Sequence, residues 1–303
     1  METAQVERQI DVVVAAVQQS PKYRAVSPDL IRRIGMRELA ARRSVKEAIK
    51  ETKNTLHQLA GAYLDRRVHY DRWLEGLSTA ASDPEAFRQT CREIMAAHAS
   101  TRERLPLLET FYTTTLAGLG PIASVLDVAC GFNPLSIPWM PLAHGAAYTA
   151  IDIYSDLATF LNSYFPLAGV SGQALVGDIG AAPPTTPVTL AMALKALPLL
   201  EQMDRQAGLN LLRALQADYL LVSFPTASLG GNNRGMIAHY EARFRDLVRS
   251  EPWQIERFAF ATELCFLVNK SQGCTKGASV LHPLPIADAL PLPFREGGRG
   301  QTP

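Results

Sequence analysis

The 303-residue sequence contains little cysteine and no long apolar run. Its four cysteines are scattered, and no two form a Cys-x-x-Cys pair, which argues against a disulfide framework and a zinc site of that type. No stretch approaches the roughly 20 apolar residues that cross a bilayer. The N-terminal apolar run 12–17 is too short for a signal-peptide core. We therefore expect a soluble, cytoplasmic protein with no membrane partner.

Metal-binding histidine patterns are also missing. The six histidines form neither a His-x-Glu motif nor a His pair three to five residues apart, so each is interpreted as structural or exposed. We expect no metal ion.

Charge is unevenly distributed, although the net formal charge is only +1. Residues 22–72 hold thirteen basic against six acidic residues, which leaves +7 in this segment and a net acidic remainder. Such asymmetry favours an anionic partner, nucleic acid above all. The alternative is an ordinary solvated helix surface with neighbouring ion pairs.

The first hundred residues show almost no strand pattern. Pro28 after Ser27 is typical of a helix start, and apolar residues then recur at helical spacing; Asp83 and Pro84 indicate another start. We predict a helical domain over residues 1–105 and a second domain over 106–272. The tail 273–303 is rich in proline and glycine without periodicity, and is predicted to be disordered.

From Ile122 onward, short β-branched and aliphatic runs alternate with helical stretches, which predicts an α/β fold. The expected strands are 123–128, 147–152, 173–176, 188–193 and 219–223, then a helix over 235–248 and a hairpin of 253–260 with 262–269. A mostly parallel, Rossmann-like sheet that ends in an antiparallel hairpin is the class I S-adenosylmethionine-dependent methyltransferase arrangement. A nicotinamide-binding fold would usually continue with another parallel unit.

The segment 125–131 places a buried strand before a turn of small residues, Asp127-Val-Ala129-Cys-Gly131, where backbone can approach a ligand closely. A dehydrogenase begins similarly, but here Asn133 and Pro134 replace the third glycine. That departure counts against pyrophosphate binding.

Acidic residues end three successive strands. Asp127 closes the first, Asp152 the second, followed by Ile153, and Asp178 follows the third, before Ile179. Asp152 is positioned to accept hydrogen bonds from ribose hydroxyls, or is simply a strand-end turn residue. Asp178 occupies the usual place of a contact to the adenine amino group. Together the three predict S-adenosylmethionine as the cofactor.

The fourth strand is followed by neither an Asn/Asp-Pro-Pro-aromatic motif nor a Pro-Cys nucleophile. Cys130 is interpreted as a small packing residue of the turn. Lys195 at the strand end could hold a phosphate or the substrate base, or could be a surface lysine.

Four separated motifs now agree in order and spacing with one family. They are His98-Ala-Ser-Thr-Arg-Glu-Arg-Leu105, Asp127-Val-Ala-Cys-Gly-Phe-Asn-Pro134, Leu194-Lys-Ala-Leu-Pro-Leu-Leu-Glu-Gln202 and Ser223-Phe-Pro-Thr-Ala-Ser-Leu-Gly-Gly231. Over residues 1–270 the sequence resembles the aminoglycoside-resistance 16S rRNA methyltransferases that modify N7 of guanosine 1405.

The resemblance implies roles for individual residues. Arg104 would bind the methionine carboxylate of the cofactor, Gly131 would lie beneath the cofactor, Asp152 would bind the ribose and Asp178 the adenine. Lys195, Glu201 and Gln202 would line the methyl-transfer side. Residues that would meet the RNA are Lys22, Arg66, Arg67, Arg234 and Met236.

The implied partner is the 30S subunit, near its decoding site, and the implied phenotype is resistance to gentamicin and kanamycin. Guanine N7 bears no proton, so no general base is required and positioning suffices. We expect a monomer. Alternatives are methylation of a small molecule or of another rRNA position, such as an adenine N1, and a non-enzymatic rRNA-binding protein with a relict cofactor fold.

Overall fold

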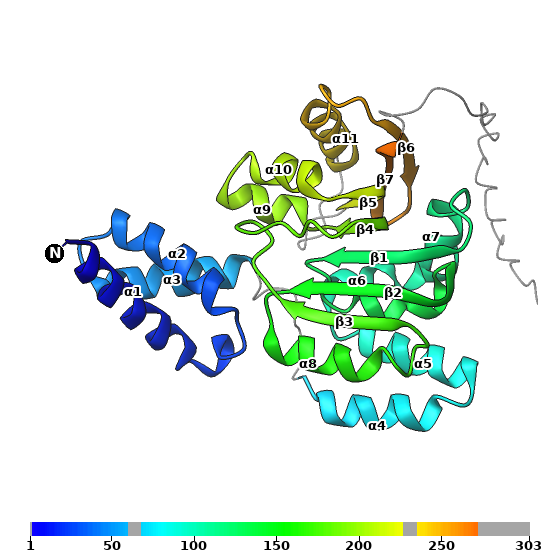
Figure 1. Cartoon of the computed structure of the whole chain (residues 1–303), viewed down its shortest axis with the longest axis horizontal. Coiled ribbons are helices and arrows are strands. Elements are labelled where there is room, and N and C mark those ends of the chain that lie inside the picture. Colours follow the sequence, from blue (N-terminus) through cyan, green and yellow to red (C-terminus); the bar gives the residue numbers. More distant parts are fainter. Residues whose placement is uncertain (1, 60–67, 227–234, 272–303) are drawn as a thin grey trace, which may run out of the picture. The chain divides into compact units, whose positions relative to one another are not determined.

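A computed structural model describes residues 2–59, 68–226 and 235–271, and residues 1–273 form one compact unit. Its centre is a seven-stranded sheet of order β3-β2-β1-β4-β5-β7-β6 (Figure 1). The strands are β1 (Ile122–Val128), β2 (Leu142–Asp152), β3 (Ser171–Val176), β4 (Val188–Leu194), β5 (Ala217–Pro225), β6 (Gln254–Ala259) and β7 (Glu263–Asn269). Strands β1 to β5 pair in parallel, whereas β7 runs antiparallel to both β5 and β6.

The expected strands and closing hairpin are therefore confirmed, with one difference. Strand β2 begins at Leu142, five residues before the expected start, and its register to β1 shifts between Ile122 and Ser124. The added residues Ala143, His144 and Gly145 have no β-branched or alternating pattern, so no local signal predicts them as strand. They lie between Leu142 and Ala147, the two residues of β2 that pair with β1 on either side of the register shift.

Helices cover both faces of the sheet, because successive side chains of a strand point to opposite sides. In β4, Leu190 and Met192 belong to one apolar core, and Ala191 and Ala193 to the other. The first core packs under α4 (Tyr70–Ala80), α5 (Pro84–Met95), α7 (Leu108–Thr115) and α8 (Ser155–Tyr164). The second packs under α9 (Leu197–Met203), α10 (Ala207–Ala214) and α11 (Met236–Leu247).

Three N-terminal helices have a core of their own, and we call them the three-helix unit. They are α1 (Glu2–Gln18), α2 (Pro28–Ala41) and α3 (Val45–Leu59). Ile10, Ile31 and Ile34 are fully buried among them. Pro28 opens α2 as expected, although the Ser27 side chain makes no capping hydrogen bond.

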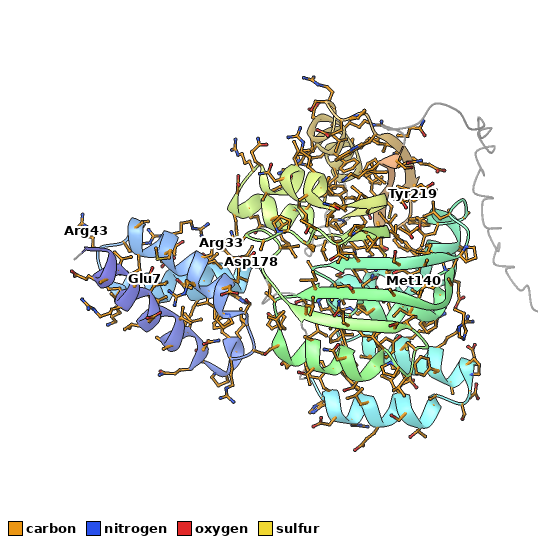
Figure 2. All side chains as sticks on the ribbon, viewed as in Figure 1. Glu7, Arg33, Arg43, Met140, Asp178 and Tyr219 are labelled. Carbon is orange, nitrogen blue, oxygen red and sulfur yellow. The ribbon has the colours of Figure 1, made fainter. Side chains whose placement is uncertain are left out.

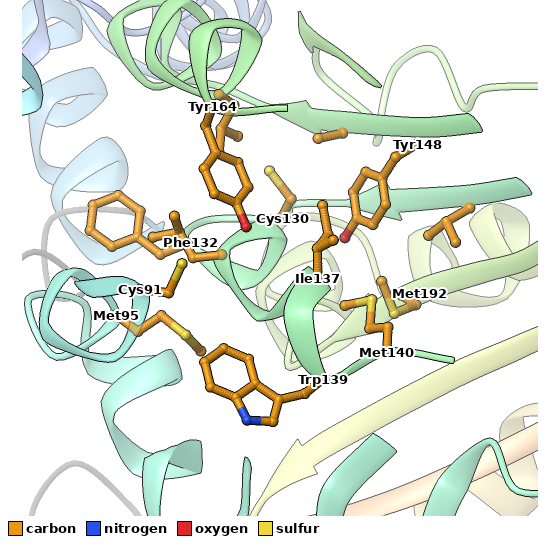
Figure 3. Close-up of a cluster of buried hydrophobic side chains, with 14 of the residues drawn as sticks. Cys91, Met95, Cys130, Phe132, Ile137, Trp139, Met140, Tyr148, Tyr164 and Met192 are labelled. Atoms are coloured by element: carbon orange, nitrogen blue, oxygen red, sulfur yellow. The ribbon is translucent and has the colours of Figure 1, made fainter. Parts of the chain in front are cut away.

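The next helices pack on the sheet. They are α4 (Tyr70–Ala80), α5 (Pro84–Met95), α6 (Ala99–Arg104) and α7 (Leu108–Thr115). The Asp83 side chain caps α5 by accepting from the amides of Glu85 and Ala86, so the predicted helix start is confirmed. Figure 3 shows Cys91 and Met95 of α5 in the same core as side chains of the sheet. The helical region thus consists of two differently packed parts.

Residues 273–303 lie outside the described residues, so the prediction for the tail stays a prediction. Among the helices within the described ranges, none combines the length and apolar character that a membrane crossing requires.

Candidate functional site

A cleft opens where β1, β2, β3 and β4 end. Seven of the residues singled out in the sequence line it: Ala129, Gly131, Asp152, Ile153, Asp178, Ile179 and Lys195. The carboxyl edge of a parallel sheet is where ligands of α/β proteins bind, because the loops there leave a crevice. The structure therefore brings together residues that are up to 66 positions apart in the sequence.

The turn after β1 is held against the end of β2 by one carboxylate. Asp152 accepts hydrogen bonds from the amides of Gly131 (2.8 Å) and Ile153 (2.7 Å). Burial raises the pKa of Asp152, and these amide donors oppose the increase. Gly131 has φ +50°, and a Cβ added there would lie 3.2 Å from the His98 ring. Both constraints explain why glycine stands at this position.

Asp127 lies behind the cleft and does not line it. The side chain is buried and accepts from Asn133 Nδ2 (2.9 Å) and the Tyr148 hydroxyl (2.8 Å). Its other oxygen, Oδ1, has no hydrogen-bond partner within the described part of the chain. Burial raises the pKa of Asp127 to about 7, although the two donors oppose the increase.

Asp178 is engaged by an arginine from the three-helix unit. Arg33 of α2 donates from Nε to Asp178 Oδ2 (2.5 Å) and from Nη2 to Oδ1 (2.9 Å), a bidentate pair (Figure 2). The Gly180 amide also donates to Oδ1 (3.1 Å). Arg33 itself lines the cleft, although the sequence indicated only that it belongs to a basic segment.

Lys195 is buried, with 6% of its surface exposed, so the surface-lysine alternative is wrong. Its ammonium donates to Glu103 Oε2 (2.6 Å) and the Ser100 carbonyl (3.3 Å), and lies 3.7 Å from Glu263 Oε2. Its backbone has φ +59°. Lys195 and Ala129 are the two non-glycine residues with positive φ in the described ranges, and both line the cleft. Backbone strain of this kind concentrates at functional sites.

Arg104 is not among the lining residues. Its fully buried guanidinium donates to both carboxylate oxygens of Glu263 (3.0 and 2.6 Å) and to Asn133 Oδ1 (2.6 Å). Burial alone would raise the pKa of Glu263, but the charges of Arg104 and Lys195 outweigh it and lower that pKa. The contact expected for Arg104, to the cofactor carboxylate, stays a prediction.

Two residues expected on the transfer side lie elsewhere. Glu201 of α9 is buried and forms an ion pair with Arg243 of α11, and Gln202 is exposed; neither lines the cleft. The residues of α9 that do line it are Leu199, Leu200 and Met203. Cys130 is buried, and burial raises its pKa well above the usual thiol value. A packing role fits this environment.

The expected RNA contacts are only partly described. Lys22 is exposed, and its ammonium lies 2.7 Å from His57 Nδ1. Met236 begins α11 and is half-buried. Arg66, Arg67 and Arg234 lie outside the described residues, so their roles stay predictions.

Several residues of the site were not predicted from the sequence, among them Arg33, Ser100, Glu103 and Glu263. Ser100 and Glu103 stand in the His98–Leu105 motif, which was a signal for them. Glu263 begins a strand 159 residues after its partner Arg104, and no local pattern marks it. Within the residues that the structure describes, no three His, Cys, Asp or Glu side chains form a group that could hold a metal ion.

Comparison with known proteins identifies relatives over most of the chain. A family model described as "Ribosomal RNA methyltransferase (FmrO)" matches residues 19–267. A 16S rRNA (guanine(1405)-N(7))-methyltransferase of Frankia casuarinae is 37% identical over 87% of this chain and 95% of its own length. One of Micromonospora echinospora is 35% identical over 89% of this chain and all of its own length.

Solved structures agree with the fold. The 16S rRNA methyltransferase RmtF in complex with S-adenosyl-L-homocysteine superposes with a TM-score of 0.73 at 30% identity, covering 87% of this chain and 98% of RmtF. The 16S rRNA methylase RmtB gives a TM-score of 0.71 at 29% identity, covering 86% and 98%. The predicted fold class is thereby confirmed.

Proposed function

Because the chain belongs to the ribosomal RNA methyltransferase (FmrO) family, we propose that it transfers a methyl group from S-adenosylmethionine to N7 of guanosine 1405 in 16S rRNA. The observation that carries the proposal is the cleft, which is lined by Asp152 at the end of β2, by Asp178 after β3 and by Ala129, whose φ is positive. Relatives named for this reaction, similar over nearly their whole length, support the choice of target.

The polar and apolar groups that line the cleft fit S-adenosylmethionine. Two carboxylates, Asp152 and Asp178, can accept from ribose hydroxyls and an adenine amino group. Ile153, Ile179 and Leu200 supply apolar surface for the base. A bound S-adenosylmethionine supplies an electrophilic methyl group on its sulfonium. Gly131 keeps the floor of the cleft free of side-chain atoms.

We assign Arg104 and Asp127 to the support of the methionine end. For Arg104 to bind the methionine carboxylate, its guanidinium must share its charge between Glu263 and the ligand. Asp127 fixes Asn133, and Asn133 in turn fixes Arg104, so both act on the same turn. Asp127 therefore acts as a positioning residue in this proposal.

Lys195 is our candidate for the transfer side. Its ammonium is anchored by Glu103 and the Ser100 carbonyl, and its stem borders the cleft. Glu201 and Gln202 stay in the proposal as the residues that follow Leu199 and Leu200 on α9, although neither lines the cleft. Guanine N7 offers a lone pair without a proton, so the enzyme needs to hold the base in line with the methyl carbon. Extrusion of the base from its stack costs roughly a few kcal/mol.

The rRNA-docking function is proposed for residues 1–105 and the catalytic function for residues 106–272. Lys22, Arg66 and Arg67 would contact folded 16S rRNA of the 30S subunit by shape and phosphate, and Arg234 with Met236 would contact the RNA near the target base. We expect a monomer that works in the cytoplasm, where 30S subunits are found.

Borohydride–aniline cleavage of 16S rRNA tests the proposal, since only N7-methylguanosine gives strand scission. We expect a cut at guanosine 1405 after incubation of 30S subunits with the protein and cofactor, and none with Asp152→Ala. Cells that express the protein should resist gentamicin and kanamycin but not apramycin. Methylation without scission at this guanosine would assign another position, such as an adenine N1. Absence of any methylation, with intact cofactor binding, would favour a relict fold.

A further inference from the structure

One side chain from the three-helix unit reaches the cleft of the sheet and forms an ion pair there. Arg33 approaches Asp178 with both Nε and Nη2, at 2.5 and 2.9 Å, and its Nη2 also lies 3.5 Å from the sulfur of Met203. The side chain of Asp178 is only 6% exposed, whereas that of Arg33 is 33% exposed. The carboxylate is therefore enclosed by the cleft, with the arginine covering it from α2.

We propose that Arg33 is a positioning residue of the cofactor site, which orients the carboxylate of Asp178 toward the adenine amino group and makes adenine selectivity depend on the three-helix unit. The inference rests on the proposed function, because it takes the ligand to be S-adenosylmethionine. It adds a residue from outside the sheet to the set that recognises the base.

The place of Arg33 is fixed by backbone contacts on the N-terminal side of α2. The Ser27 amide donates to the Ile153 carbonyl (2.7 Å), and the Ser155 amide donates to the Ala25 carbonyl (2.8 Å). Val26 and Tyr154 form an antiparallel bridge between these two bonds. Segment 25–27 is thus paired with the residues that directly follow Asp152.

Apolar packing adds to these contacts. Ile153 and Tyr154 pack against the core of the three-helix unit, as does Met203 of α9. Leu30 of α2 and Leu59 of α3 also line the cleft. The wall that contains Arg33 is therefore continuous with both the helical core and the ribose end of the cleft, so the arginine cannot shift independently of either.

The chemistry requires a fixed, ionised carboxylate. An ionised carboxylate only accepts hydrogen bonds, so it selects an amino group over a carbonyl oxygen. A lone carboxylate can rotate about its terminal torsion, which is broad, and so turn its lone pairs away from the base. A bidentate guanidinium prevents this rotation, because it fixes the plane of the carboxylate.

Calorimetric titration with two ligands tests this proposal. One is S-adenosylhomocysteine, and the other is S-inosylhomocysteine, in which oxygen replaces the 6-amino group. We expect the unaltered protein to prefer the first by roughly a hundredfold. Arg33→Ala should lower the affinity for S-adenosylhomocysteine by about tenfold and leave the affinity for S-inosylhomocysteine almost unchanged. The preference for adenine then falls to about tenfold. Arg33→Lys should fall between the two, since it keeps the charge and loses the fork.

Arg32→Ala is the matched control. Arg32 precedes Arg33 on α2, but it pairs with Glu7 and Asp11 of α1, inside the three-helix unit. We expect this variant to keep both affinities. In an Asp178→Ala background, Arg33→Ala should have little further effect on the preference, because the two residues act through one carboxylate.

The possible results separate the two proposals. If the unaltered protein binds neither ligand, the proposed function fails. If it binds S-adenosylhomocysteine and Arg33→Ala keeps the full preference for adenine, the role of Arg33 is wrong while the function stands. If Arg33→Ala and Arg32→Ala lower both affinities equally, the arginines serve only the fold, and the proposal is overturned. Should Arg33→Ala fail to fold, an unchanged preference in Arg33→Lys overturns it equally.

Discussion

Two arginine–carboxylate pairs differ in how much water they meet: Arg33–Asp178, which lines the cleft and which we call the half-open pair, and Arg104–Glu263, which lies behind Lys195 and which we call the sealed pair. Arg104 and Glu263 are both completely buried, at the junction of α6 and β7. Arg33 and Asp178 connect α2 to the end of β3, and a third of the Arg33 side chain is exposed. Both pairs have bidentate geometry. Their difference lies in what replaces a lost partner.

A partner lost from the sealed pair cannot be replaced by water, so the remaining charge stays uncompensated in the interior. A partner lost from the half-open pair is replaced by solvent, and the energy at stake is small. The half-open pair lines the cleft and is accessible to a ligand, whereas Arg104 of the sealed pair can bind one only by sharing its charge with Glu263.

The largest effect is expected for Glu263→Gln. The substitution leaves Arg104 without its buried counter-charge and Lys195 with Glu103 alone, and we expect the free energy of unfolding to fall by roughly 3–5 kcal/mol. Urea denaturation followed by circular dichroism measures it. The control is Glu241→Gln, which breaks the more exposed pairs with Arg245 and Arg257 and should cost less than about 1 kcal/mol. Equal losses in the two variants would abolish the distinction between sealed and open pairs.

The second effect concerns Asp127, which stands next to the sealed pair through Asn133. Its pKa in the folded protein is about 7, above the usual value of 3.8. Folding is therefore favoured by the protonated form, and this contribution is complete below the unfolded pKa and is lost as pH rises through about 7. Between pH 5 and pH 8 the loss is about 2–3 kcal/mol.

Asp127→Asn should remove this pH dependence. Urea unfolding of both proteins at several pH values measures it: relative to the variant, the unaltered protein should lose stability as pH rises. A constant difference between the two across this range would show that Asp127 does not titrate there.

A smaller effect is expected at the turn between the two pairs. Gly131→Ala meets both a positive φ and the His98 ring, whereas Gly120 has φ +60° and nothing within 4 Å of an added Cβ. We expect Gly120→Ala to cost about 1 kcal/mol in unfolding free energy from backbone strain alone. Gly131→Ala should lower the free energy of unfolding by more than this, and it should also lower the affinity for S-adenosylhomocysteine measured by calorimetry. If the two variants lose the same unfolding free energy and keep the same ligand affinity, the close approach of the His98 ring to Gly131 affects neither stability nor binding.

The smallest effect on stability is expected for Arg33→Ala. Because water can reach the vacated position, we expect a loss below about 1 kcal/mol in the same urea experiment. A loss as large as that of Glu263→Gln would place this pair with the sealed one. In calorimetry the same variant should clearly lower the affinity for S-adenosylhomocysteine, so the two measurements together separate recognition from stability.

Much of the fold could be predicted because it depends on local pattern. The runs around Val125, Ala150 and Leu190 are mostly apolar, as is typical of parallel strands covered by helices. The turn after β1 was recognisable from its small residues, and Asp152 and Asp178 from their place at strand ends. Each of these signals lies within a few residues.

The remainder depends on contacts between distant segments. Arg33 and Asp178 are 145 residues apart, and Arg104 and Glu263 are 159 apart. Any arginine in a basic segment has the same local appearance, so nothing separated Arg33 from Arg32. Likewise the sequence indicated helices up to residue 105, but not that those after residue 70 share a core with the sheet. Only tertiary packing decides such pairings.

The wall that α2 and α3 add to the cleft bears on the design of inhibitors. Compounds that imitate a nucleoside often act on many enzymes, because the strand-end residues that they contact recur wherever this type of sheet binds a nucleoside. Leu30, Arg33 and Leu59 come from helices outside the sheet. A compound extended by an apolar group and an acid toward these three side chains would gain contacts that depend on the three-helix unit. Such an extension offers a route to drugs that leave unrelated enzymes of the host untouched.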